Sequence, residues 1–154
     1  MVVFRATLLV AIILCCSLLP ESGFAADPDY RTYLTSESSN EIPLNEAQQY
    51  FDCSDTVYAV VEINNLRPGT HQLETIWRDP EGRKRETTRH PFHTAGGVAR
   101  VWSWLRLHGP GGIAASVGRA FDPSLGMEEF IGEWTVRIAV DGEKIAVLKF
   151  EVLC

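Results

Sequence analysis

Apolar residues on every second position constrain the fold of this chain more than any other feature. Within residues 56–63 one phase of the alternation is made of Val57, Ala59, Val61 and Ile63. The same period of two recurs in residues 71–78, 98–107, 133–140 and 146–152. Successive side chains of a β-strand point to opposite faces, so this period predicts strands. No long segment follows the helical period, and we therefore predict an all-β chain.

Turn residues separate these segments at short intervals. Residues 79–82 (DPEG) form a predicted turn, in which Pro80 presets its own φ and Gly82 takes the final position. The next segment, residues 83–89 (RKRETTR), is polar and basic. This composition is typical of an edge strand, because charges there discourage pairing with other chains. The spacing of strands and turns predicts an antiparallel β-sandwich of about six to eight strands.

The C-terminal hairpin allows a register to be predicted. Its apolar residues are Trp134, Val136, Ile138 and Val140 before the turn and Ala146, Leu148, Phe150 and Val152 after it. A two-residue loop of Asp141 and Gly142 would put these two sets on opposite faces, because a slip of one residue flips every side chain. We therefore predict a three-residue loop over 140–142 with a bulge and with Gly142 at positive φ. In that register Trp134 pairs with Leu148, and Val136 pairs with Ala146.

Two segments resemble a known family. The pattern Gly132-x-Trp134-x-Val136-x-Ile138-x-Val140-Asp141-Gly142, followed by Phe150-x-Val152, resembles the last hairpin of immunoglobulin-like domains in small exported bacterial proteins. The segment from Leu66-x-Pro68-Gly69 to Trp77-x-x-Pro80-x-Gly82 resembles their central hairpin. The resemblance implies an immunoglobulin-like sandwich used for adhesion, for assembly or as an accessory subunit, and it brings no catalytic residues. Antibody-type domains bridge two central strands over a buried Trp, whereas here Cys53 precedes a strand and Cys154 is the last residue.

The first residues carry the pattern of a secretory signal peptide. Residues 1–5 bear one positive charge, residues 6–19 are an unbroken apolar run, and Gly23 and Ala25 are small residues suited to a cleavage site. The run is shorter than the roughly 20 residues of a transmembrane helix. Leu14 before Cys15 fits a lipoprotein cleavage site poorly. We expect cleavage after Ala25, with Ala26 as the alternative, and a secreted or periplasmic protein without stable membrane insertion.

The predicted organisation follows from this signal. Residues 1–25 are the signal peptide, residues 26–50 a flexible N-terminal arm that allows one short strand, and residues 51–154 the β-sandwich domain. Cleavage leaves two cysteines, Cys53 and Cys154, in an oxidising compartment. We expect them to form a disulfide that closes a loop of roughly 100 residues, which is worth about 4–5 kcal/mol in the chain-entropy model. Two free thiols and a catalytic cysteine are the alternatives.

Charge and motifs exclude several classes of function. The net charge of −6 argues against nucleic acid as a partner, because phosphate binding needs clustered Lys and Arg. His90 and His93 are spaced as half of a metal site, but on a strand they point to opposite faces, and neither His71 nor His108 forms a second pair with them. The glycines of residues 109–112 lack the rest of a phosphate-binding loop, and Ser116 is outside any nucleophile elbow. We expect no cofactor, no metal and no catalytic residue.

One strand face supplies the best candidate for binding. Arg100, Trp102, Trp104 and Arg106 alternate with apolar residues along residues 98–107. An exposed strip of this kind suits a protein partner, since Trp and Arg dominate interface hot spots, or a glycan stacked on Trp. If the face points inward, the two tryptophans belong to the core, and the sequence leaves this open.

These observations lead to one functional hypothesis and one alternative. We expect an exported, non-enzymatic β-sandwich that acts as a binding or accessory protein of the cell envelope and contacts another protein or an envelope component. The alternative is a small exported metal-binding protein or hydrolase that uses the long segment 108–126, because loops of that length in compact domains are often functional.

Overall fold

The computed structural model describes residues 27–106 and 128–154. In this part of the chain there is no α-helix, so the prediction of an all-β chain is confirmed. The elements are β1 (Asp29–Thr35), β2 (Ser38–Ser39), β3 (Ile42–Pro43), β4 (Tyr50–Asp52), β5 (Thr56–Leu66), β6 (Gly69–Arg78), β7 (Lys84–Thr94), β8 (Gly97–Arg106), the 3-10 turn η1 (Glu128–Phe130), β9 (Gly132–Val140) and β10 (Glu143–Leu153).

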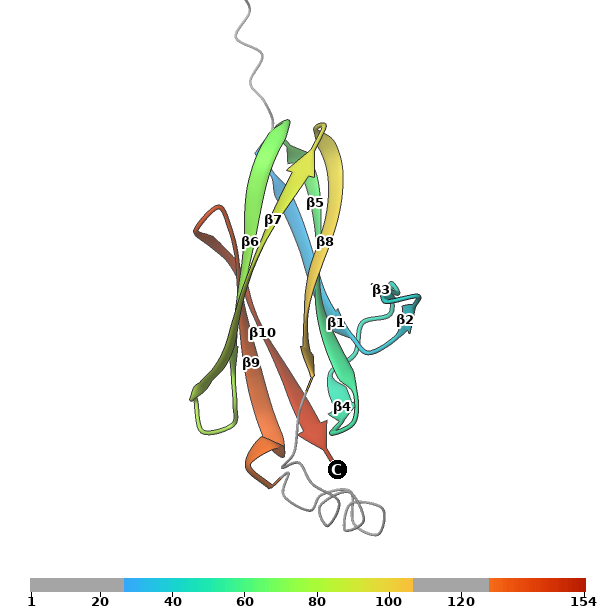
Figure 1. The fold of residues 1–154 in the computed structure, drawn as a ribbon, viewed down its shortest axis with the longest axis vertical. Helices are drawn as coiled ribbons and strands as arrows, with labels where there is room; N and C mark the ends of the chain where they lie inside the picture. The colour runs from blue at the N-terminus through green and yellow to red at the C-terminus, as the bar shows by residue number, and fades with distance from the viewer. Residues whose placement is uncertain (1–26, 107–127) are drawn as a thin grey trace, which may run out of the picture.

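The long strands form two sheets that lie face to face (Figure 1). One sheet has three strands in the order β1-β5-β8, and the other has five in the order β4-β10-β9-β6-β7. Strands β2 and β3 form a small separate hairpin beside the three-stranded sheet. Strand β4 pairs with β10 in parallel, so the prediction of a purely antiparallel arrangement is wrong at this edge. A long connection, rather than a tight turn, separates these two strands along the chain, which is what a parallel pair requires.

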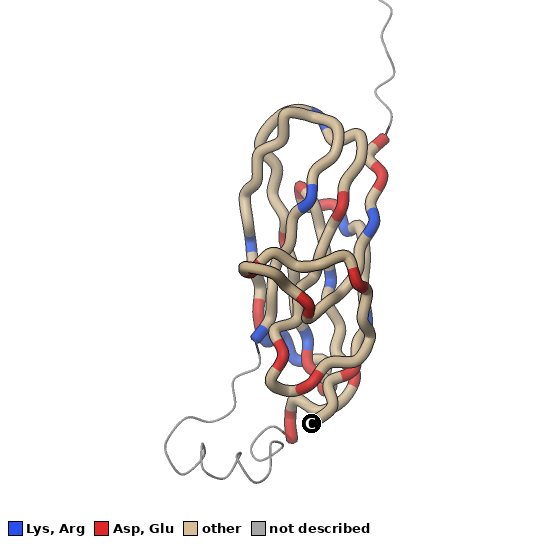
Figure 2. Tube along the Cα trace, turned by 90° about the vertical axis from the view of Figure 1, so that its right-hand side faces the viewer, with Lys and Arg blue, Asp and Glu red and all other residues tan. Residues whose placement is uncertain are grey.

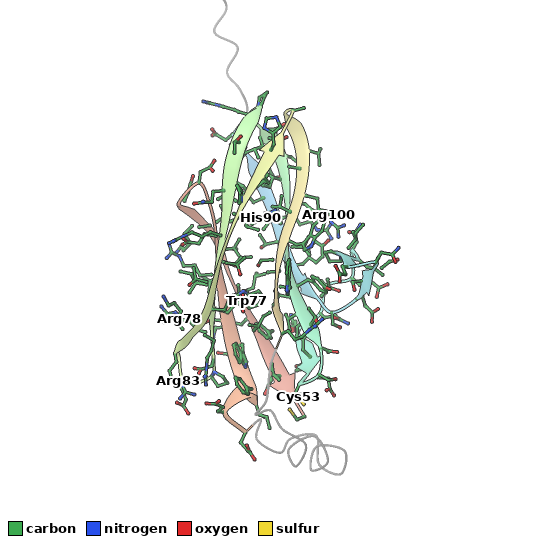
Figure 3. All side chains as sticks on the ribbon, viewed as in Figure 1. Cys53, Trp77, Arg78, Arg83, His90 and Arg100 are labelled. Atoms are coloured by element: carbon green, nitrogen blue, oxygen red, sulfur yellow. The ribbon has the colours of Figure 1, made fainter. Side chains whose placement is uncertain are left out.

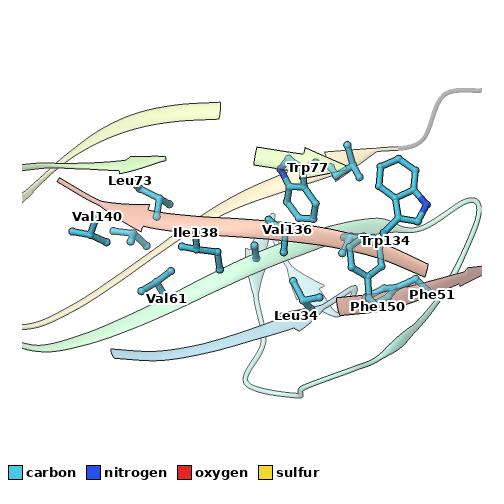
Figure 4. Close-up of a cluster of buried hydrophobic side chains, with 14 of the residues drawn as sticks. Leu34, Phe51, Val61, Leu73, Trp77, Trp134, Val136, Ile138, Val140 and Phe150 are labelled. Atoms are coloured by element: carbon cyan, nitrogen blue, oxygen red, sulfur yellow. The ribbon is translucent and has the colours of Figure 1, made fainter. Parts of the chain in front are cut away.

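The core fills the space between the two sheets (Figure 4). Strand β5 contributes the alternating residues that the sequence indicates, and β9 contributes Trp134, Val136 and Ile138. Trp77 and Trp134 are fully buried, and both pack against the Phe150 ring, with ring centroids 6.0 and 6.1 Å from it. A buried hydrogen bond of 2.8 Å between Thr75 of β6 and Ser103 of β8 joins the two sheets. The alternating pattern therefore specifies which face of each strand is buried.

The N-terminal segment differs from the expected flexible arm. Residues 29–35 form strand β1, which pairs with β5 at seven consecutive positions. Tyr30 packs against the core, and Leu34 lies within it. The many Asp, Ser and Thr residues of this segment suggested mobility, but Tyr30, Thr32 and Leu34 alternate at the strand period and face the core. The packed domain therefore begins at β1 rather than at residue 51.

The C-terminal hairpin corrects the predicted loop. Val140 pairs with Glu143, so the loop has two residues, Asp141 and Gly142, with φ of 51° and 84°. Both values are positive, as in a type I′ turn. A bulge between Lys144 and Ala146 then restores the phase. As a result Trp134 pairs with Phe150 and Val136 with Leu148, rather than with Leu148 and Ala146. The apolar sets do share one face, as predicted, but the bulge achieves this instead of a longer loop.

The predicted turn at residues 79–82 and the predicted edge strand are both confirmed. The Gly82 N–H donates to the Asp79 carbonyl at 2.8 Å, which closes the turn, and Gly82 has a φ of 78°. Strand β7 pairs only with β6 and is the edge of the five-stranded sheet. Charged residues of both signs are spread along the strands (Figure 2). On β7, Arg85 bonds to Asp79 and Glu129, so part of the basic stretch is engaged in ion pairs.

Candidate binding surface

The outer face of the three-stranded sheet, which points away from the core, carries the predicted strip. Pairing between β5 and β8 places Tyr58 opposite Trp104 and Val60 opposite Trp102. Val101, Ser103 and Leu105 of β8 are buried on the inner side. The four residues Arg100, Trp102, Trp104 and Arg106 therefore share one face, as the alternation predicts, and this face is the outer one, which the sequence left open.

The two tryptophans of this face have different environments. Trp102 is partly buried and packs on a small apolar cluster of Tyr33, Tyr58 and Val60. Trp104 is 56% exposed. The outer face thus has its own small apolar cluster, and Trp104 is the large side chain at its margin that remains open to solvent. Figure 1 shows the strands from which these side chains come, with β1, β5 and β8 side by side.

Arg100 holds the surface together. Its guanidinium donates to the Tyr33 hydroxyl at 2.8 Å and to the Pro43 carbonyl at 2.7 Å, and it lies 3.6 Å from the Glu62 carboxylate. The Tyr33 hydroxyl donates in turn to Asn45 at 3.0 Å. These bonds fasten residues 43–45 onto the outer face, so Arg100 is a positioning residue of the surface rather than a group available to a ligand.

The segment between β1 and β4 folds back over this face, which the sequence analysis missed. The Gln48 side chain accepts from the Ser36 N–H at 2.6 Å, and the Gln48 N–H donates to the Leu34 carbonyl at 2.7 Å. Asn40 and Glu41 have φ of 51° and 64° and form the tight turn between β2 and β3. Asn40, a residue type enriched in the left-handed region, was the one local signal for this hairpin, and Glu41 gave none.

A hollow of about 540 Å³ lies between this hairpin and the sheet. Asn40, Glu41 and Ile42 line one side, and the sheet contributes Thr56, Tyr58, Trp102, Trp104 and Arg106. Ile42 is 51% exposed at its margin. The Arg106 guanidinium donates to the Thr56 hydroxyl at 3.1 Å. The hollow therefore combines aromatic rings with polar groups at its rim, which is the composition of many binding sites.

A second groove of about 640 Å³ runs along the other side of the same tryptophans. It lies between β7 and β8 and is lined by Thr88, His90, Phe92, His93, Thr94, Ala95, Gly96, Val98, Ala99, Arg100, Val101, Trp102 and Trp104. None of these lining residues is acidic. Figure 3 labels His90 and Arg100 on the two strands that border the groove. Trp102 and Trp104 are thus shared by two concave surfaces.

The histidines are dispersed. His90 and His93 are three residues apart on β7 and so point to opposite faces of the strand. His71 is held elsewhere, 2.7 Å from Asp141 and 3.0 Å from the Arg67 carbonyl. Within residues 27–106 and 128–154, no three His, Cys, Asp or Glu side chains are grouped as metal ligands. His108, Ser116 and the segment 108–126 lie outside the described residues.

Cys53 and Cys154 lie next to each other at the parallel edge. Leu153 of β10 is in register with Asp52 of β4, and the Cys53 N–H donates to the Leu153 carbonyl at 3.1 Å. Figure 3 places Cys53 beside the C-terminal end of β10. Partial burial, and after it a hydrogen bond with the Cys53 side chain, raise the pKa of the Cys154 thiol to about 12. The two sulfur atoms are not bonded to each other in this structure.

No protein-family model matches the chain, and no curated protein sequence does. In the described part of the chain, no helix has the length and hydropathy needed to cross a membrane. The likeness of the chain to solved structures concerns the fold alone.

The chain is similar to part of the alkylpurine DNA glycosylase AlkC from Pseudomonas fluorescens, solved bound to DNA containing an abasic site analog, with a TM-score of 0.51 and 9% identity over 84% of this chain and 31% of that chain. For a β-glucosidase from Listeria innocua the values are 0.45 and 12%, over 81% and 16% of the two chains. A putative β-galactosidase from Bacteroides fragilis gives 0.44 and 21%, over 79% and 16%. The chain therefore spans less than a third of each of these proteins.

Proposed function

We propose that the protein is an exported, non-enzymatic binding or accessory protein of the cell envelope, built on an immunoglobulin-like β-sandwich, and that it contacts another protein through the surface around Trp104. The signal pattern of residues 1–25 supports export. Two sheets packed face to face, with turns at short intervals, support the sandwich. The one parallel pair, β4 with β10, sits at an edge and leaves the central strands antiparallel.

The exposure of Trp104 carries the proposal. A tryptophan that is 56% exposed leaves a large apolar ring in water, and it does so between two concave surfaces. Tryptophan is among the residues that contribute most to binding energy when a partner buries it. Tyr58 lies opposite Trp104 in the ladder and belongs, with Trp102, to the apolar cluster of this face, so Trp104 lies beside a packed base. A rigid aromatic side chain beside a hollow is what an interface anchor requires.

Photocrosslinking in the producing cell tests this function. A photoreactive benzoylphenylalanine in place of Ile42, at the rim of the hollow, should crosslink the protein to a defined partner. The same group in place of Val147, which is 52% exposed on β10, is the matched control. Adding Trp104→Ala to the Ile42 probe should abolish the crosslink, while adding Leu153→Ala should not. Equal crosslinking from positions 42 and 147, or a crosslink indifferent to Trp104→Ala, would contradict the proposal.

The exported state has a separate test. Intact mass of the protein recovered from outside the cytoplasm should correspond to a chain that starts at Ala26 or Asp27. A full-length chain, or one carrying a lipid on Cys15 or Cys16, would contradict the expected cleavage.

A further inference from the structure

Among residues 27–106 and 128–154, strand β8 has one edge with no strand paired to it. In the described part of the chain, β8 pairs only with β5, and β7 pairs only with β6. The two strands are consecutive and lie close together in Figure 1, but no ladder joins them. Alternate backbone N–H and C=O groups of β8 therefore point away from β5 along a strand of ten residues.

The five-stranded sheet extends past this edge. The hydrogen bond between Thr75 and Ser103 places β8 opposite β6. Strand β7 is the next strand beyond β6, so it overhangs the three-stranded sheet. Cross-strand pairing puts His90 beside Leu73 and Thr88 beside Thr75, on the face that points toward the other sheet. Leu73 and Thr75 are buried, whereas His90 is exposed and Thr88 half-buried, because the smaller sheet has no strand opposite β7.

The two edges are guarded to different degrees. Strand β7 carries Lys84, Arg85, Arg89 and Pro91, which are the features that protect an edge against added strands. The inner-facing positions of β8 are Ala99, Val101, Ser103 and Leu105, none of which is charged, and Arg100 is bound to Tyr33 and Pro43. Val98 is 74% exposed at the start of the strand. Between Val98 and Leu105, strand β8 is therefore a less guarded edge than β7, next to a groove of about 640 Å³.

We infer that the partner supplies one extended segment, which pairs with the free edge of β8 as a fourth strand and fills the groove under β7. This inference rests on the proposed function and specifies how the partner binds. In that position the inward side chains of the segment contact Phe92, His90 and Thr88, and its outward side chains lie beside Trp102 and Trp104. Addition of a strand to a sheet edge is a recurring mode of peptide recognition, in which backbone bonds give affinity and alternate side chains give specificity.

Charge and shape define the segment. The groove is lined by two histidines and no acidic residue, in a chain with a net charge of −6, and its one arginine, Arg100, is already bound to Tyr33, Pro43 and Glu62. A segment with acidic residues among alternating apolar ones complements this surface. A second copy of the chain fits poorly. If the β8 strands of two copies paired antiparallel, the overhanging β7 strand of each copy would have to cover the β8 strand of the other copy as well as its own. The groove has room for one added strand rather than for a second sheet.

Selection from a library of random ten-residue peptides on the full mature protein tests the inference. We expect enriched sequences in which apolar and polar residues alternate and acidic residues are frequent. Methylation of single backbone nitrogens in the best peptide should weaken binding about tenfold at alternate positions and little at the positions between them. Hydrogen exchange should show the β8 amides that point away from β5 unprotected in the free protein and protected in the complex, whereas the amides bonded to β5 are protected in both. On the protein, Val98→Asp should weaken binding and the matched Val147→Asp should not.

Several results would overturn strand addition. Backbone methylation that weakens binding equally at consecutive positions, or nowhere, would mean that side chains alone dock. Protection in the free protein of the β8 amides that point away from β5 would mean that the edge is covered without a partner. A concentration-dependent dimer that Val98→Asp dissociates would identify a second copy as the occupant. The crosslink from position 42 and its loss with Trp104→Ala can persist in each case, so strand addition and the proposed function fail separately.

Discussion

The four tryptophans of the chain form two pairs in opposite environments. Trp77 and Trp134 are fully buried between the sheets, where they pack on Phe150. Trp102 and Trp104 lie on the outer face, one half-buried and one largely exposed. All four lie on strands whose side chains alternate with a period of two, so the period of the sequence does not distinguish buried from exposed tryptophans. Their neighbours at every second position do. Trp134 shares its strand face with Val136 and Ile138, whereas Trp102 and Trp104 share theirs with Arg100 and Arg106.

The largest expected difference between the pairs is in stability. Trp134→Ala removes a fully buried ring and the bond from its indole N–H to the Phe130 carbonyl, 2.7 Å long. Truncation of a buried aromatic residue costs about 3–5 kcal/mol. Trp104→Ala removes a largely exposed ring and should cost less than about 1 kcal/mol. Urea unfolding of both variants measures the comparison.

Binding should show the reverse order. Trp104→Ala should abolish partner binding while the protein remains folded. Trp134→Leu keeps an apolar side chain in the core, so its folded molecules should bind the partner with unchanged affinity. If Trp104→Ala destabilised the protein as much as Trp134→Ala, the outer face would be a second core and not a binding surface.

The second prediction concerns the cysteines at the edge of the inner core. We propose that Cys53 and Cys154 form a disulfide under oxidising conditions. Oxidised glutathione would accept the two electrons and two protons that the thiols lose, and it would leave as two molecules of glutathione. Disulfides typically stabilise by about 2–4 kcal/mol, chiefly by restricting the unfolded chain, and the chain-entropy value of about 4–5 kcal/mol for this loop is the upper end of the expected effect. Since the bond lies away from Trp104, oxidation should raise the urea midpoint without changing partner binding.

Intact mass and unfolding under oxidised and reduced conditions measure this effect. The raised pKa of Cys154 leaves little thiolate at neutral pH, so we expect oxidation to be slow at pH 7 and faster in alkaline buffer. Cys154→Ser is the control, and its stability should not depend on the oxidant. A pair that stays reduced in oxidised glutathione at alkaline pH, or oxidation that leaves stability unchanged, would count against the staple.

The third prediction separates support of the outer face from contact with a partner. Arg100→Lys keeps the charge but cannot reproduce the bonds to both Tyr33 and Pro43. Bonds from a charged donor in a partly buried site are worth about 1.5–3 kcal/mol, so we expect a loss of about 1–2 kcal/mol after allowance for solvent exposure. Amides of residues 36–49 should also exchange faster. Arg31→Lys, an exposed residue on the same face that pairs with Glu62, is the control and should cost less than about 0.5 kcal/mol.

If Arg100→Lys weakened partner binding without affecting exchange in residues 36–49, Arg100 would contact the partner directly. That result would restore the role that the sequence suggested for it. Loss of binding together with faster exchange in residues 36–49 supports the positioning role.

The sequence predicted strand faces better than strand partners. Period-two alternation was sufficient to assign the inner and outer residues of β5, β9 and β10, because burial acts on each side chain separately. For β8 it separated the two faces but left open which of them is buried. It failed for β1, where a composition rich in Asp, Ser and Thr concealed the alternation of Tyr30 and Leu34. The bulge between Lys144 and Ala146 was also missed, because a longer loop and a bulge restore the same phase.

The candidate surface was only half predictable. The alternation identified Trp102 and Trp104, but their different exposure depends on Tyr33 and Tyr58, which come from other strands. The engagement of Arg100 depends on Pro43, which is 57 residues away in sequence. Local patterns cannot specify contacts over such separations, since these follow from strand order and from the hairpin that folds over the sheet.

The smallest expected effect is the pH dependence of stability that arises from His71 and Asp141, which belong to neither tryptophan pair. The hydrogen bond to Asp141, followed by the bond to the Arg67 carbonyl, raises the pKa of His71 above its ordinary value of 6.5. Burial alone would raise the pKa of Asp141, but bonds from His71 and from the Gln72 N–H outweigh it and lower that pKa below 3.8. Both ring nitrogens of His71 face acceptor oxygens, which favours the protonated ring.

The sign of the effect follows from these two shifts. The contribution of His71 is complete below pH 6.5 and is lost as the pH rises through its raised pKa, while that of Asp141 is lost as the pH falls through its lowered pKa. The pair therefore stabilises most between about pH 4 and 6.5. Asp141→Asn, which tolerates the same positive φ, should cost less than about 1 kcal/mol, because the Asp141 side chain is 51% exposed and water screens the pair.

Urea unfolding at pH 5.5 and pH 8.5 measures this difference, and the cost of Asp141→Asn should be larger at pH 5.5. Thr87→Ser, on an exposed position of β7 without a titratable group, is the control and should cost the same at both values. An equal cost of Asp141→Asn at the two pH values would mean that the carboxylate acts only through its bond to the Gln72 N–H, which does not require a charged histidine. Because neither His71 nor Asp141 lines the hollow or the groove beside Trp104, Asp141→Asn should leave partner binding unchanged at both pH values.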